Sequence, residues 1–136
     1  MTHPNKYASD VLDYFYEEGD RDLIYFGDII GEVSYDANDV KFAKTDEQRF
    51  MDACRLVRYL TDSHDFDVGT NLELHGEVME YVPFIGGYEE FFAIASRLFS
   101  EKGIDDMELD FAGWLRKKKK GKPAPPATDD IAKLFG

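Results

Sequence analysis

The sequence predicts one mainly helical α+β domain with a small antiparallel sheet and a flexible C-terminal tail. Three observations lead to this fold class. Apolar residues recur at three- and four-residue spacing in several long segments, which is typical of amphipathic helices. Residues 65–84 are instead rich in strand-forming residues and turn signals, which favours a hairpin. At Gly121 the composition changes to a proline-rich stretch, so we expect residues 1–120 to form the domain and 121–136 the tail.

The first third of the chain predicts a helix over residues 6–18, ended by Gly19. Residues 23–26 are apolar and long enough for a brief strand. A second helix over 28–33 follows, with Asp28 as its cap. A single helix over 22–33 remains an alternative, although Gly27 argues for a break.

Three further helices are expected. Thr45 and Gln48 have capping-box spacing at the start of a helix over 45–63. A wide apolar stripe predicts a helix from residue 88 that ends at Gly103. A last amphipathic helix is expected over 104–120, with acids in its first turn and lysines in its last. Its apolar seam comprises Ile104, Met107, Phe111 and Trp114. The predicted core residues of the two strongest helices are Phe50, Val57, Phe91, Phe92, Ala95, Leu98 and Phe99.

The predicted hairpin has two candidate turns. Residues 69–71 and His75-Gly76 each carry turn-forming residues, so the register stays open. Pro83 limits the second strand to an edge of the sheet or to its own last residues, because proline lacks the amide donor of a ladder.

The order helix, strand, helix, helix, hairpin, helix over residues 6–102 resembles that of winged-helix domains. The resemblance implies that the helix over 45–63 enters a DNA major groove and that the hairpin is the wing. Another α+β fold with helices on one face of a small sheet accounts for the same order. The hairpin carries Glu73, Glu77 and Glu80 without any Lys or Arg, so a domain of this kind would be expected to bind protein.

Charge is divided sharply along the chain. The net charge of −12 combines −17 over residues 1–115 with +5 over residues 116–136. An acidic body repels phosphate backbones and attracts basic proteins, so any nucleic-acid binding should be weak. The cations available to a polyanion, or to the protein's own acidic face, are Arg116, Lys117, Lys118, Lys119, Lys120 and Lys122. A nucleic-acid-associated winged-helix protein that binds through the basic run 116–122 is our alternative functional hypothesis.

Acids and tyrosines alternate in the N-terminal region, where ten acids fall between residues 10 and 39 and only Arg21 interrupts them. Tyrosines supply interface area at low entropy cost, and carboxylates steer a basic partner. This composition predicts a protein-binding module that resembles inhibitors or immunity proteins directed at a nucleic-acid-binding protein. The candidate partner-binding residues are Asp10, Asp13, Tyr14, Glu17, Glu18, Tyr25, Asp28 and Glu32.

The tail predicts a second binding element. Ile131, Leu134 and Phe135 have helical spacing at the end of a proline-rich linker, so they could present one apolar edge to a partner. We expect this docking peptide to be unfolded in the free monomer. The alternative is that the tail folds back onto its own domain.

No residue pattern predicts catalysis. The single cysteine, Cys54, lies on an apolar helix face, and no nucleophile elbow, dinucleotide fingerprint or phosphate loop is present. His64 lies among acids, but their spacing matches no calcium loop. We therefore expect a non-enzymatic protein without metal or cofactor. Short apolar runs and the lone cysteine also predict a protein of the reducing cytoplasm without a membrane span.

Overall fold

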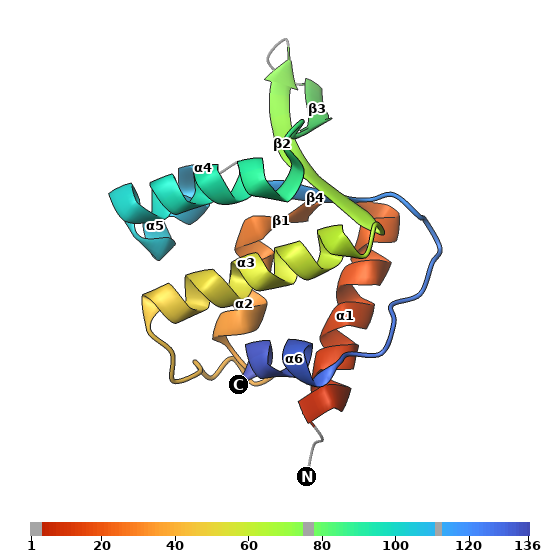
Figure 1. Cartoon of the computed structure of the whole chain (residues 1–136), viewed down its shortest axis with the longest axis vertical. Helices are drawn as coiled ribbons and strands as arrows, with labels where there is room; N and C mark the ends of the chain where they lie inside the picture. The colour runs from red at the N-terminus through yellow and green to blue at the C-terminus, as the bar shows by residue number, and fades with distance from the viewer. Residues whose placement is uncertain (1–3, 75–77, 111–112) are drawn as a thin grey trace.

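The chain folds into helices packed around a small sheet, as the sequence predicts (Figure 1). The computed structural model describes residues 4–74, 78–110 and 113–136, and the structural statements below concern these residues. The larger helices are α1 (Pro4–Arg21), α2 (Phe26–Ser34), α3 (Asp46–Asp62) and α4 (Gly87–Lys102). The shorter ones are α5 (Ile104–Asp110), α6 (Asp129–Ala132) and the 3-10 turn η1 (Lys133–Phe135). The strands are β1 (Ile24–Tyr25), β2 (Phe66–Leu74), β3 (Val78–Pro83) and β4 (Trp114–Lys117).

The sheet is antiparallel throughout and has the order β1-β4-β2-β3. Leu115 in β4 lies opposite both Ile24 and Val68, so β4 joins the first strand to the hairpin. Leu74 pairs with Val78, which places the connection at residues 75–77; the turn predicted at His75-Gly76 thus lies outside the described residues. The other candidate turn, 69–71, is wrong, because those residues lie within β2.

The predicted helix over 104–120 is wrong in its second half, because residues 114–117 form strand β4. Ile104 and Met107 are buried in α5 as the seam required, but the described helix ends at Asp110. Residues 114–117 alternate in burial, with Leu115 and Lys117 inside, which is the two-residue period of a strand. The backbone amide of Phe26 donates to the carbonyl of Gly113 over 3.0 Å, so this segment also anchors the start of α2.

Several local predictions are confirmed. The chain forms a short strand at 24–25 followed by α2, rather than one helix over 22–33, but α2 begins at Phe26, so Asp28 lies in its first turn and is not its cap. The Thr45 side chain accepts a hydrogen bond from the backbone amide of Gln48 over 3.1 Å. The Gln48 side chain, however, donates to Asp52, which replaces the return half of the predicted capping box. Gly103 ends α4 with a φ of 80°, a conformation that favours glycine.

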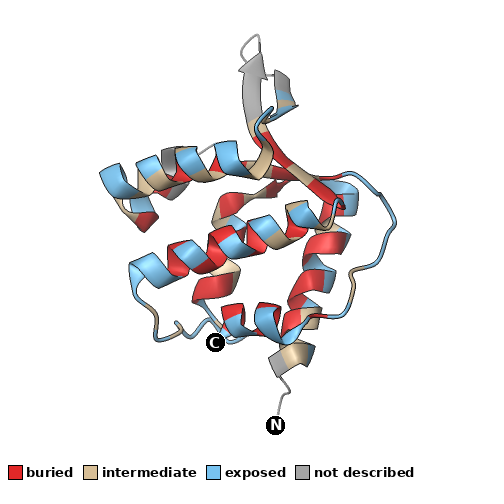
Figure 2. Cartoon of the chain, viewed as in Figure 1, coloured by how far each residue is buried: buried red, intermediate tan, exposed pale blue. Residues whose placement is uncertain are grey.

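The core lies where α1, α2 and α3 face one another and the sheet (Figure 2). Four of the seven predicted core residues are buried, namely Phe50, Val57, Phe91 and Ala95. The other three, Phe92, Leu98 and Phe99, are only partly buried and pack against the edge of this core. The aromatic ring of Phe50 contacts that of Phe99 at 4.5 Å between centroids, so α3 and α4 meet through their predicted apolar faces.

The C-terminal tail is part of this core, which corrects the prediction of a free docking peptide. The linker runs along the outside of the molecule and returns α6 and η1 to α1, α2 and α3 (Figure 1). Ile131, Leu134 and Phe135 are buried against these helices. The buried Lys44 ammonium donates to the carbonyl oxygens of Leu134 and Val33, at 2.6 and 2.7 Å, and thereby ties the tail to α2.

Leu134→Ala is expected to lower the free energy of unfolding by about 2–5 kcal/mol, because it removes a buried side chain and leaves a cavity. Chemical denaturation of the full chain measures this change. Lys133→Ala is the matched control, since that side chain is exposed in the same turn, and it should change stability by about 0.5 kcal/mol or less. Equal stability of the two variants would contradict the packed position of the tail.

Candidate functional site

An acidic groove lies between α1, α2 and the loop that follows α2. Its volume is about 280 Å³, and it is lined by Tyr14, Gly27, Asp28, Gly31, Glu32, Tyr35, Asp36 and Asp39. Three of these residues, Tyr14, Asp28 and Glu32, belong to the predicted partner-binding set. Asp28 and Glu32 are four residues apart and therefore lie on the same side of α2.

The other predicted interface residues lie outside the groove. Asp10 pairs with Lys6 at 3.2 Å, and Glu18 pairs with Arg21 at 2.6 Å, both on the exposed side of α1. Tyr25 is partly buried at the sheet, where its ring contacts that of Trp114. Asp13 and Glu17 instead line a separate hollow of about 210 Å³ beside the linker.

Sequence reasoning missed the far wall of the groove. Tyr35, Asp36 and Asp39 come from a loop that turns back beside α2. The Asp36 carboxylate accepts hydrogen bonds from the amides of Asn38 and Val40, at 2.8 and 3.0 Å, and so holds this turn. Asp39 has a φ of 61°, the left-handed backbone that a tight turn requires. Asp36, Asn38 and Asp39 are turn-forming residues, so the sequence indicates a turn here, but it does not indicate that the turn lies against α2.

Two glycines of α2 line the groove, and one of them keeps it open. Gly27 and Gly31 are four residues apart on α2, so both lie on the side that carries the groove. A Cβ atom placed on Gly31 would meet no atom within 4 Å, so this position opens directly into free space. The paired spacing of Gly27 with Gly31 and of Asp28 with Glu32 is a sequence signal that could have located the groove.

The charge of the groove is uncompensated. Burial raises the pKa of Asp28, and Glu18 raises it further. Burial likewise raises the pKa of Glu32, with added repulsion from Asp28 and Asp39. None of the eight described lining residues is basic, and no described cation forms an ion pair with Asp28 or Glu32. The groove therefore favours a positively charged occupant.

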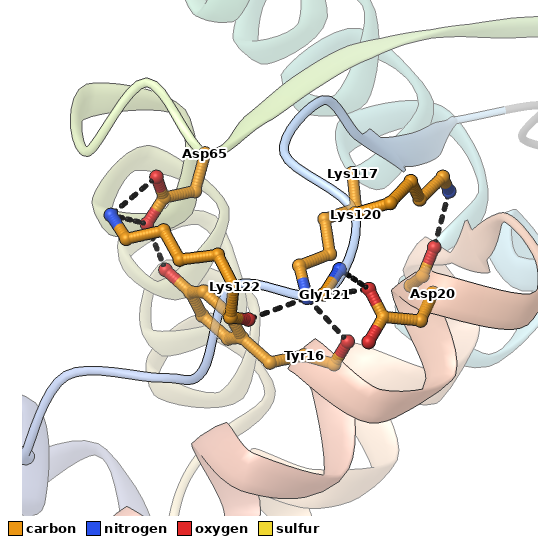
Figure 3. Close-up of polar contacts among 8 residues, drawn as sticks. Tyr16, Asp20, Asp65, Lys117, Lys120, Gly121 and Lys122 are labelled. Carbon is orange, nitrogen blue, oxygen red and sulfur yellow. Dashed lines mark hydrogen bonds and ion pairs between the residues drawn. The ribbon is translucent and has the colours of Figure 1, made fainter.

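The basic run has a different environment, because it folds onto acidic and carbonyl groups of its own domain (Figure 3). The fully buried Lys117 ammonium donates to the carboxylate of Asp20 at 2.7 Å and to the carbonyls of Tyr16 and Lys122 at 3.0 and 2.7 Å. All three of its N–H donors are thereby satisfied. Lys122 donates to both oxygens of Asp65, at 2.7 and 2.9 Å.

Three of the four remaining cations of the run also contact groups of the domain. Arg116 pairs with Asp67 at 2.8 Å, Lys119 lies 3.5 Å from Asp65, and Lys120 donates to the carbonyl of Gly19. Lys118 is exposed. Burial would raise the pKa of Asp65, but hydrogen bonds from Lys122 and Tyr16 outweigh it and hold the pKa below its usual value. Five of the six predicted polyanion contacts are thus engaged within the fold.

The other residues considered for catalysis or metal binding, His64 and Cys54, occupy a turn and the core. His64 adopts a φ of 63° in the turn after α3. Burial raises the pKa of Cys54 to about 12, so its thiol is unreactive near neutral pH. In the described part of the chain, no group of three or more His, Cys, Asp or Glu side chains could hold a metal ion. No described helix is long and apolar enough to cross a membrane.

Comparison with known proteins gives no match from which a function could be inferred. The chain matches no family model, no curated protein and no solved structure.

Glu32→Gln is expected to stabilise the protein at pH 7. A carboxyl whose pKa is raised by folding costs stability when ionised, and this cost disappears as pH falls below the ordinary carboxyl pKa of about 4. Thermal or chemical unfolding at a series of pH values should therefore show a gain near neutrality that vanishes in acid. Glu17→Gln, an exposed charge on α1, is the control. A pH-independent gain, or an equal gain in the control, would contradict the electrostatic argument.

Proposed function

We propose that the protein is a non-enzymatic binding module whose acidic groove accepts a Lys or Arg side chain of a basic partner protein. The observation that carries this proposal is the uncompensated charge of Asp28 and Glu32 in a groove with tyrosine walls. Functional surfaces often retain charges that lower the stability of the free protein. A cationic side chain would relieve the repulsion, and Tyr14 and Tyr35 could pack against its stem or face its charge.

The charge of the whole chain favours the same class of partner. A net charge of −12 draws basic proteins by long-range attraction and raises their association rate. Proteins that bind nucleic acid carry such basic surfaces. We therefore propose an inhibitor-type role, similar to that of an immunity protein, in which the acidic face competes with nucleic acid for a basic partner.

The alternative, direct nucleic-acid binding through residues 116–122, has less support. Lys117 is buried, and four other cations of the run are paired with groups of the domain. A phosphate backbone would have to displace these contacts. It would also approach a domain that carries −17 over residues 1–115.

The experiment is affinity capture of proteins from the native host, followed by affinity measurement on the captured partner. Wild type should retain a basic protein at physiological salt. The double variant Asp28→Asn/Glu32→Gln should weaken its binding at least about tenfold, or about 1.4 kcal/mol. Glu89→Gln/Asp106→Asn is the charge-matched control, because both carboxylates are exposed on α4 and α5, away from the groove.

A steric variant separates the shape of the groove from its charge. Gly31→Leu keeps every carboxylate and places a side chain in the open space above α2, so it should fold and also lose the partner. Equal weakening by the groove variant and the control would indicate unspecific charge attraction and overturn the proposal. Capture of a partner that both groove variants bind normally would overturn it as well.

A further inference from the structure

The C-terminal segment packs against α1, α2 and α3 of its own domain, and we call the surface of these helices that it covers the tail groove. Apolar contacts bury Leu134 and Phe135, and the ring of Phe135 meets the ring of Tyr7 edge-on at 6.1 Å. Polar contacts fix its register. Asn5 donates to Asp129 at 2.7 Å, and Lys44 donates to the Leu134 carbonyl at 2.6 Å. The segment, one α-helical turn followed by a 3-10 turn, therefore packs into the tail groove through its apolar edge.

The connection to this segment is short and has a defined anchor at each end. Lys122 is held by Asp65, and the amide of Ala127 donates to the Ser9 hydroxyl at 3.0 Å. Only residues 123–126 lie between these anchors, and three of the four are prolines. Proline favours an extended linker and cannot form a regular ladder of hydrogen bonds, so this stretch joins the segment to the body without a helix or strand of its own.

We propose that residues 127–136 exchange between two copies of this chain, each copy inserting its C-terminal segment into the tail groove of the other. The second copy is the occupant that the structure favours, because its segment is identical and would remake every contact described above. Exchange of an identical element is a low-cost route to a dimer, since only the path of the linker changes.

Two quantities set the conditions for exchange. A short linker gives the chain's own segment an effective concentration in the millimolar range, so monomers should dominate at micromolar protein. Each copy also carries a net charge of −12, and screening by salt weakens their repulsion. The exchanged dimer should therefore increase with both protein concentration and ionic strength.

The decisive experiment mixes two variants of the full chain that each carry one added cysteine, Asn5→Cys and Asp129→Cys, which are unfolded and refolded together and then treated with a short bis-maleimide. These positions contact each other across the tail groove, so a covalent heterodimer forms where the segment of one chain lies in the tail groove of the other. Replacing Asp129→Cys by Asp105→Cys, an exposed position on α5, gives the control for random collision. Buried Cys54 is common to all variants.

Linker length supplies a second, independent test. Deleting Pro125 and Pro126 shortens the linker by about 6 Å at the 3.1 Å per residue of an extended proline helix. We expect the shorter linker to disfavour insertion into the chain's own tail groove, so dimers should become the main species at 0.1 mM, about tenfold more than for wild type. Inserting four Gly-Ser residues at the same place should reduce the dimer.

The proposal requires heterodimer cross-links that rise with concentration and salt and exceed the Asp105→Cys control severalfold. Cross-links no greater than this control at protein concentrations up to about 1 mM would overturn it. A shortened-linker variant that remains monomeric would also overturn it. Because the cysteine experiment keeps the native linker, it decides the question even where the deletion variant does not fold.

Discussion

The buried ammonium of Lys117 is the interaction on which much of this fold depends. It lies in β4, the strand that joins β1 to the hairpin, and it reaches the carbonyl of Tyr16 and the carboxylate of Asp20 at the end of α1. A buried charge is tolerated only where its donors are fully satisfied, so this position fixes α1, the sheet and the following loop relative to one another. Gly121, with a φ of 82°, allows that loop to turn and donate its own amide to Asp20.

The same charges also distinguish the two acidic regions of the molecule. Around Asp20 and Asp65 the basic run neutralises the acids, which makes these contacts structural. Along α2, Asp28 and Glu32 receive no such compensation and their pKa values rise. The chain has sixteen Lys and Arg residues, and several of them pair with one acidic region while none pairs with Asp28 or Glu32 in the described residues. This contrast, rather than the number of acids, marks the groove as the candidate interface.

Features that depend on residues close together in the chain could be predicted from the sequence, whereas features that depend on tertiary contacts could not. The Thr45 cap and the end of α4 at Gly103 depend on neighbouring residues, and they were predicted correctly. Strand β4 was missed because four alternating residues are a weak signal beside a helical seam that continued through Trp114. The cluster of lysines also fits a helix terminus as well as it fits its actual partners, Asp20 at the end of α1 and the buried Asp65 before β2. At the site, Asp28 and Glu32 were found from composition, whereas Asp36 and Asp39 required the tertiary position of a loop.

Helix α2 connects the acidic groove with the C-terminal segment. Its outer side carries Asp28 and Glu32, while Ile29, Ile30 and Val33 face the core. The C-terminal segment contacts α2, and Lys44 bridges the Val33 carbonyl, the Leu134 carbonyl and the Asp52 carboxylate. The last turn of α2 is therefore held by the tail and by α3 at once. Since the loop carrying Tyr35, Asp36 and Asp39 begins at that turn, the tail helps to fix the wall of the acidic groove without lining it.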